Sequence, residues 1–261
     1  ILMCSPLSRD LIAGAIGESG AGIPPTLAPW DLRGAEERGK TLCEALGANS
    51  LRDLRALPAM ELLKGADEKS PGIWNGTLDG YLLNKPLAAT LDAGEQAHVP
   101  LLVGWNSEEM GYAALMGGPD ISEEAYIKVV RERFGQAADE ILRLYPCGSP
   151  DELKRSATAL ASDSFIAYST WKWSDAHANT SGHPVFRYLY SRPRPPMTPE
   201  FGDAVAALAG GVVRGEEAEA MRMPPATGAV HSAEIEYALG NLATNKVYAW
   251  TDEDYALSEL M

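Results

Sequence analysis

The sequence has few cysteines, few basic residues and no long apolar run. Its 261 residues include three cysteines and 22 Lys+Arg against 36 Asp+Glu. No CxxC motif or Cys/His cluster occurs, which argues against a metal site, and an odd cysteine count allows at most one disulfide. No stretch of 18 or more residues is continuously apolar, so we expect no membrane span.

The charge and the apolar content exclude further classes of protein. The formal net charge is −14, and a nucleic-acid partner is not expected because its phosphates require a basic surface. The apolar fraction of 46% can supply a core, which excludes disorder as the dominant state. The residues from Ile1 to Pro6 do not form a secretory signal and lack an initiating Met, so we expect the chain to begin within a longer protein.

Segments with helical periodicity alternate with short apolar segments. The alternation predicts an α/β fold with a mostly parallel sheet, and the length allows one large domain or two small ones. Helices are expected over 33–46, 122–134, 137–145 and 151–175, and strands over 98–104, 184–190 and, as a third candidate, 11–17.

One segment matches the phosphate-binding pattern G-x4-G-K-[ST], at Gly34 to Thr41. A phosphate loop follows a strand, whereas prolines precede this segment. Its interior, Ala-Glu-Glu-Arg, favours a helix, and the two carboxylates would repel a triphosphate. A solvated helix is the favoured interpretation, and a nucleotide-binding protein is the weakest alternative function.

A second segment approaches the serine nucleophile elbow G-x-S-x-G. It reads Gly17-Glu18-Ser19-Gly20-Ala21, with alanine where the motif needs its last glycine. The prolines that follow do not begin the helix that an elbow requires. Ser19 is therefore predicted to end a strand, and not to act as a nucleophile.

An acidic pair follows the strand expected over 98–104. Glu108 and Glu109 come just after it, and ligands gather at the carboxyl ends of strands in open α/β sheets. The alternative interpretation is a helix start capped by Asn106 or Ser107. The residues by themselves do not decide between the two.

The four histidines differ in their placement. His98 and His183 precede the strands, at the wrong end for catalysis, and His177 ends a long helix, where a cation suits the helix dipole. His231 follows the last strand and opens a helix. It is the candidate general base, although its spacing alone leaves the assignment open.

Several segments in the same order resemble the type B carboxylesterase family, the cholinesterase-like branch of the α/β-hydrolases. Leu2–Arg9 and Ala15–Ala21 resemble the stretch that follows the nucleophile elbow, and Asp79–Tyr81 resembles the Asp-Gly turn. Asn106–Glu109 resembles the acid turn. The segment His231–Tyr237 fits His-Gly/Ser-x-Glu-Ile-x-Tyr/Phe and is the most specific match. The resemblance spans Ile1 to Met261.

The resemblance implies an incomplete α/β-hydrolase fold, in a single partial domain over residues 1–261. It also implies a Ser-Glu-His triad in a small-molecule ester hydrolase without a cofactor. Glu109 would be the acid, with Glu108 as the alternative, and His231 would be the base. Ser19 would bond to the acid. The nucleophilic serine and the oxyanion loop would precede Ile1, so the chain alone is expected to be inactive. The family also implies a secreted or periplasmic protein.

A non-catalytic binding module on the same fold is the main alternative, because a fold does not determine a function. Such a module would lack the upstream serine. The retained acid and histidine argue against it, since binding alone does not require both.

Overall fold

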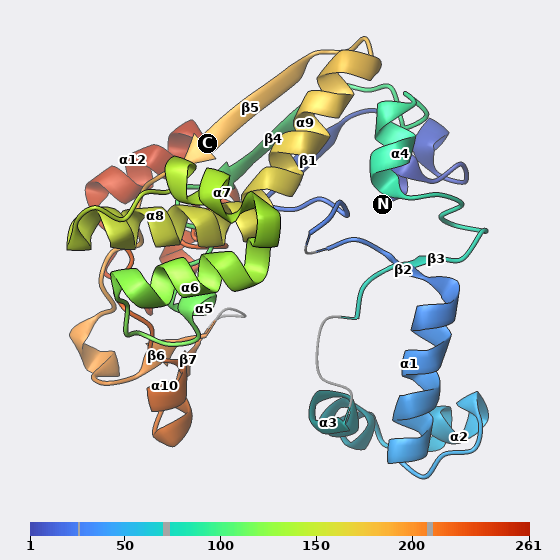
Figure 1. Cartoon of the computed structure of the whole chain (residues 1–261), viewed down its shortest axis with the longest axis horizontal. Helices are drawn as coiled ribbons and strands as arrows, with labels where there is room; N and C mark the ends of the chain where they lie inside the picture. The colour runs from blue at the N-terminus through green and yellow to red at the C-terminus, as the bar shows by residue number, and fades with distance from the viewer. Residues whose placement is uncertain (26, 70–73, 208–210) are drawn as a thin grey trace. The chain divides into compact units, whose positions relative to one another are not determined.

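The computed structural model describes residues 1–25, 27–69, 74–207 and 211–261. The chain divides into two compact units, each shown in Figure 1. The first unit comprises Ile1–Ala15, Ala21–Leu101 and Lys172–Val185, and the second comprises Ile16–Gly20, Leu102–Trp171 and Phe186–Met261. The single domain expected over residues 1–261 stays a prediction.

Three strands form the main sheet in the order β1-β4-β5 (Figure 1). They are β1 (Ala15–Glu18), β4 (Leu101–Asn106) and β5 (Val185–Tyr190), and all but the first residue of each belongs to the second unit. The strand expected over 184–190 is confirmed. The other two begin later than expected, and in β4 one reason is that Pro100 has no N–H to donate to a ladder.

Backbone hydrogen bonds define the direction of the strands. Ala15 N donates to Pro100 O and Ser19 N donates to Gly104 O. From the first bond to the second, both strands move toward their carboxyl ends by the same number of residues. Leu101 N to Pro184 O and Ser107 N to Tyr190 O repeat this advance between β4 and β5. Both pairs of strands are therefore parallel, as the alternation of elements predicted.

This register aligns Ile16, Leu102 and Phe186 in one row across the sheet. Side chains of a strand alternate between its two faces, so the three share a face. They are 69%, 39% and 61% exposed, whereas Leu101 and Val103, which point to the other face, are fully buried. One face of the sheet thus packs against the core, and the other presents an apolar row.

We expect the isolated 261-residue chain to aggregate through this row, and Phe186→Lys to reduce the aggregation. The side chain is largely exposed, so the free energy of unfolding should change by less than about 0.5 kcal/mol. Light scattering and dye binding to exposed apolar surface measure the effect. Val103→Lys is the matched control and should unfold the chain. Unchanged scattering by a folded Phe186→Lys chain would contradict the prediction.

Four helices of the second unit pack into one cluster (Figure 1). They are α5 (Tyr112–Met116), α6 (Glu123–Phe134), α7 (Ala138–Leu144) and α8 (Pro150–Ser162). The side chain of Ser122 accepts a hydrogen bond from Ala125 N and caps α6, which confirms the helix expected over 122–134. The helix expected over 137–145 is confirmed by α7. It is preceded directly by the 3₁₀ turn η3 (Gly135–Ala137).

The long helix expected over 151–175 is interrupted. It consists of α8, a π-helical turn named η4 (Asp163–Ala167), and α9 (Tyr168–Thr180). Apolar residues continue from α8 through this turn, at Phe165 to Ala167, so the sequence pattern does not distinguish it from an α-helix.

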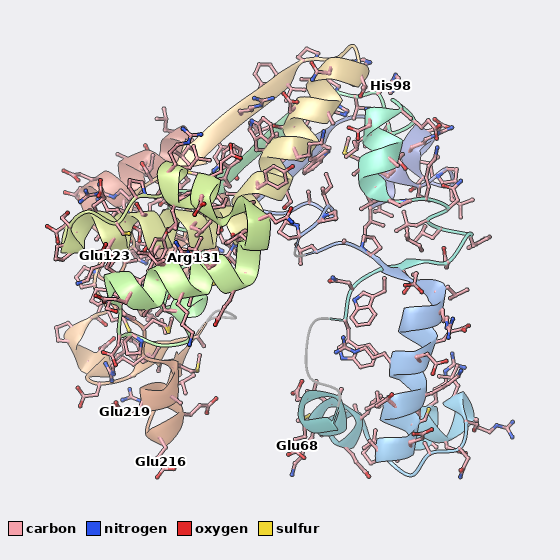
Figure 2. The ribbon with its side chains drawn as sticks, viewed as in Figure 1. Glu68, His98, Glu123, Arg131, Glu216 and Glu219 are labelled. Atoms are coloured by element: carbon pink, nitrogen blue, oxygen red, sulfur yellow. The ribbon has the colours of Figure 1, made fainter. Side chains whose placement is uncertain are left out.

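The rest of the second unit follows β5. It contains an antiparallel pair of short strands, β6 (Val205–Ala206) and β7 (Val212–Val213), and helices α10 (Glu216–Met221), α11 (Ile235–Ala238) and α12 (Asp252–Leu260), with the short turns η5 (Pro199–Phe201) and η6 (Leu242–Thr244). The acidic excess lies on exposed positions such as Glu216 and Glu219, which point away from α10 in Figure 2.

The first unit contains η1 (Leu2–Cys4), η2 (Arg9–Leu11), β2 (Trp30–Asp31), α1 (Leu32–Ala45), α2 (Leu51–Ala56), α3 (Ala59–Lys69), β3 (Thr77–Leu78) and α4 (Leu87–Asp92). The segment Gly34–Thr41 lies inside α1, whose first turn is capped by Asp31. Its backbone N–H groups beyond the first turn are therefore used within the helix. The favoured interpretation as a helix is confirmed, and the phosphate-loop interpretation is wrong.

The interpretation of His177 as a cation at a helix end is wrong. His177 is fully buried near the end of α9, where its Nε2 donates to Val99 O at 2.9 Å. Burial lowers the pKa of its imidazole and outweighs the hydrogen bond to Val99 O, which raises it. The neutral ring, paired also with Gln96, is part of the packing of the first unit.

The structure also bears on membranes and metals. Among the described helices, none combines the length and the apolar character needed to cross a membrane. The described residues contain no group of three or more His, Cys, Asp or Glu side chains arranged to hold a metal ion. Cys4, Cys43 and Cys147 are free thiols.

Candidate active site

Three of the side chains singled out from the sequence meet in the second unit. Glu109 Oε2 accepts a hydrogen bond from His231 Nδ1 at 2.6 Å, and Oε1 accepts one from Ser19 Oγ at 2.5 Å. Ser19 follows β1 directly and Glu109 lies just after β4, so both come from the carboxyl ends of neighbouring parallel strands. A buried carboxylate is therefore held between a hydroxyl and an imidazole.

The imidazole is held in one orientation by this contact. The carboxylate can only accept, so Nδ1 of His231 carries the proton and Nε2 is the basic nitrogen. The side chain of Glu109 is fully buried and that of His231 is 31% exposed. The arrangement leaves one basic nitrogen on a half-buried ring, which suits proton transfer to and from a bound reactant.

The carboxylate of Glu109 changes the pKa of His231. Its hydrogen bond raises the pKa of His231 above the ordinary value, although burial acts in the opposite direction. The charges of Glu109 and Glu234 add to the increase. The acid therefore stabilises the protonated form that a general base reaches during a reaction.

Backbone conformation is unusual on both sides of this pair. Among the described residues, the non-glycine residues with positive φ are Ser19, at 52°, and Ser232, at 65°. Such conformations cost on the order of 1–3 kcal/mol and are found preferentially at functional sites. The first directs Ser19 toward Glu109, and the second lies in the turn directly after His231.

Asn106 connects the loops that carry the acid and the base. Its backbone N donates to Glu109 Oε1 at 2.6 Å, and its side-chain Nδ2 donates to Val230 O at 2.8 Å. The same Nδ2 also donates to the carboxylate of Glu234, which is 2% exposed. The fully buried amide thus links two segments that are distant in the sequence, the end of β4 and the segment from Val230 to Glu234.

Neither Asn106 nor Ser107 caps a helix, so that alternative interpretation is wrong. Asn106 is the last residue of β4, and α5 begins at Tyr112 with Gly111 as its N-cap. Ser107 Oγ accepts instead from Ala229 N at 3.0 Å. A polar residue after an apolar strand gives the same local pattern in both cases, and only the distant partners distinguish them.

Glu108 has different partners from Glu109. Its carboxylate accepts hydrogen bonds from the backbone N of Thr227, at 3.1 Å, and from the Thr227 hydroxyl. Its backbone N donates to Ala229 O at 2.8 Å. Glu109, and not Glu108, therefore contacts His231. Glu108 binds the loop that precedes His231 through its hydrogen bonds with Thr227.

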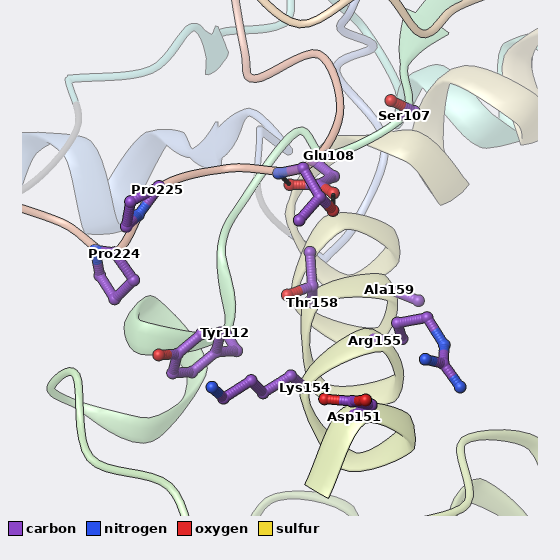
Figure 3. Close-up of a pocket in the computed structure, with 11 residues that line it drawn as sticks. Ser107, Glu108, Tyr112, Asp151, Lys154, Arg155, Thr158, Ala159, Pro224 and Pro225 are labelled. Atoms are coloured by element: carbon purple, nitrogen blue, oxygen red, sulfur yellow. Dashed lines mark hydrogen bonds between the residues drawn. The ribbon is translucent and has the colours of Figure 1, made fainter.

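Two cavities adjoin the pair. A cavity of about 370 Å³ is lined mostly by apolar residues and reaches Glu109, Phe165 and His231. A second cavity of about 660 Å³, drawn in Figure 3, lies between α8 and the Pro224–Pro225 segment and includes Lys154 and Arg155. The two share lining residues, namely Glu108, Tyr112, Thr158, Pro224 and Pro225.

Solved structures define the class of this fold. A Geobacillus stearothermophilus carboxylesterase, Est55, matches 99% of this chain and 49% of its own chain, with 17% identity and a TM-score of 0.68. A PNB esterase matches 99% of this chain and 48% of its own, with 23% identity and a TM-score of 0.67. The chain therefore has the α/β-hydrolase fold, as expected, over about half of such structures.

The family follows from the sequence comparison. The model of the carboxylesterase family matches residues 1–261, and the chain belongs to this family. Its relatives include "Cholinesterase 2" of Branchiostoma lanceolatum, 26% identical over 149 residues that cover 51% of this chain and 42% of the relative. A fumonisin B1 esterase of Sphingopyxis macrogoltabida is 30% identical over 201 residues, 73% of this chain and 35% of the relative. The chain thus spans less than half the length of these relatives.

Proposed function

We propose that this chain supplies the acid and the base of a serine carboxylic-ester hydrolase. Glu109 is the acid, His231 is the base, and the nucleophilic serine and the oxyanion donors belong to a segment N-terminal to Ile1. The observation that carries the proposal is the contact of 2.6 Å between His231 Nδ1 and a buried carboxylate at the carboxyl end of β4. The order acid then histidine along the chain is that of the α/β-hydrolases.

The proposed reaction proceeds through an acyl-enzyme. The serine Oγ attacks the ester carbonyl carbon while Nε2 of His231 takes its proton, and the resulting imidazolium is stabilised by Glu109. His231 then gives this proton to the leaving alcohol as the C–O bond of the ester breaks. Water, deprotonated by the same nitrogen, then attacks the acyl carbon. The bond to the serine Oγ breaks as His231 returns the proton to that oxygen, which releases the carboxylic acid and restores the serine.

Ser19 acts in this proposal as a positioning residue for the acid. Its hydroxyl donates to Oε1 of Glu109 at 2.5 Å, and the backbone N of Asn106 donates to the same oxygen. Two donors on Oε1 fix the plane of the carboxylate and leave Oε2 for His231. Ser19 itself bonds to the acid and not to the base, which argues against a nucleophilic role.

Activity-based labelling of the full-length protein tests the proposal. A fluorophosphonate forms a bond between its phosphorus and an activated serine Oγ, and fluoride leaves. We expect the label on a serine N-terminal to Ile1, with no label in the matched His231→Gln protein. The isolated 261-residue chain should not hydrolyse p-nitrophenyl esters.

Three outcomes would contradict the proposal. A label on Ser19, or ester turnover by the isolated chain, would place the nucleophile within these residues. No label in a folded full-length protein would favour the non-catalytic binding module instead.

A further inference from the structure

We propose that the π-helical turn η4 is a positioning element. It keeps Glu109 and His231 in their relative positions, and Phe165 is the residue that fixes the orientation of His231. The inference rests on the proposed function and assigns a role to a segment that the triad does not include. It is carried by two contacts made by residues 162 and 165: one reaches His231, and the other reaches Met110, the residue after Glu109.

The first contact reaches the base. The ring of Phe165 lies against the imidazole of His231, with 5.3 Å between the ring centroids and an angle of 84° between the ring planes. This edge-on geometry is the favoured one for aromatic pairs. The hydrogen bond to Glu109 restrains one edge of the imidazole, and Phe165 restrains its rotation about that bond.

The second contact reaches the loop that carries the acid. Ser162, the last residue of α8, is 4% exposed and pairs with Met110, the residue after Glu109. Its Oγ accepts from Met110 N at 3.2 Å and donates to Met110 O at 3.1 Å. Residues 162 and 165 thus connect the acid loop and the base through one continuous helical stretch.

The π turn itself is held in place. Asp163 accepts a hydrogen bond from the hydroxyl of Tyr145 at 2.5 Å, and Ile166 is 2% exposed. The carbonyl of Ile166 accepts from the hydroxyls of Ser169, at 3.0 Å, and Thr170, at 2.9 Å. Phe165 lies within this π turn, which continues directly from α8, while α8 keeps its apolar side, including Leu160, in the core.

The test separates positioning from contact with substrate, because Phe165 also lines the cavity of about 370 Å³ beside His231. In the full-length enzyme, Phe165→Ala is expected to lower kcat about tenfold with KM changed less than twofold. Phe165→Tyr keeps the ring edge and should restore kcat to within about twofold. Phe134→Ala is the matched control, because Phe134 is a partly buried phenylalanine packed on the core of the same unit.

Two further variants test the contact between Ser162 and the loop that carries Glu109. Ser162→Ala should lower kcat severalfold, whereas Ser156→Ala, a buried serine on the same helix, should not. Unchanged kcat in a folded Phe165→Ala enzyme would overturn the inference, as would an effect on KM alone or an equal loss in Phe134→Ala. Failure of the proposed function is distinguishable, because the wild-type full-length protein would then show neither turnover nor labelling.

Discussion

Replacing His231 by glutamine is expected to lower kcat of the full-length enzyme by about 10⁶-fold, to the level supported by substrate binding and the oxyanion donors alone. Glutamine can still donate to Glu109, so the buried carboxylate keeps a partner and the fold should persist. It has no basic nitrogen, and the serine then loses the group that takes its proton. Steady-state hydrolysis of a p-nitrophenyl ester measures the loss.

The matched control for this variant is His183→Gln, since His183 is exposed and precedes β5. Its kcat should equal that of the unchanged enzyme. Circular dichroism and thermal unfolding of both variants establish that they are folded. A folded His231→Gln enzyme that keeps more than about one hundredth of its kcat would show that another group acts as the base.

The elements that the sequence predicted well are those with strong local signals. The apolar periodicity of 122–134 predicted α6, and the β-branched and aromatic residues of 184–190 predicted β5. The π turn at 163–167 could not be predicted, because apolar residues continue through it, at Phe165 to Ala167, as they do in an α-helix. The contact of Phe165 with His231 was missed for the same reason.

The resemblance to the family predicted that Ser19, Glu109 and His231 lie together, and the structure brings these three side chains into contact. The residues alone could not show which of the two adjacent carboxylates has which partner. Glu108 bonds to Thr227, whereas Glu109 bonds to His231 and Ser19, and each of these partners is at least 90 residues away. Asn106 was predicted as part of the acid turn or as a helix cap, and its bonds to Val230 and Glu234, more than 100 residues away, had no local signal. The resemblance of the segment from His231 to Tyr237 to the family identified His231, and the same segment contains Glu234, which has no separate signal.

The second large effect is expected for Glu109→Gln, which should lower kcat by about 10⁴-fold. A glutamine amide presents a donor as well as an acceptor to Nδ1, so it no longer imposes the tautomer in which Nε2 is basic. It also removes the charge that stabilises the imidazolium. Glu108→Gln is the matched control on the adjacent residue, and because Glu108 bonds to Thr227 and not to His231, its kcat should stay within a few-fold of the unchanged enzyme.

The pH profile separates loss of the acid from general damage to the site. His231 must be neutral to act as a base, so kcat/KM rises with pH as the imidazole loses its proton. Glu109 raises the pKa of His231, and the charge of Glu234 acts in the same direction, against burial. Glu109→Gln should therefore move the acidic limb of the profile to lower pH, with Glu234 still in place, and Glu108→Gln should not move it. An acidic limb that moves in Glu108→Gln and not in Glu109→Gln would transfer the role of acid to Glu108, because the carboxylate hydrogen-bonded to the imidazole has the largest effect on its pKa.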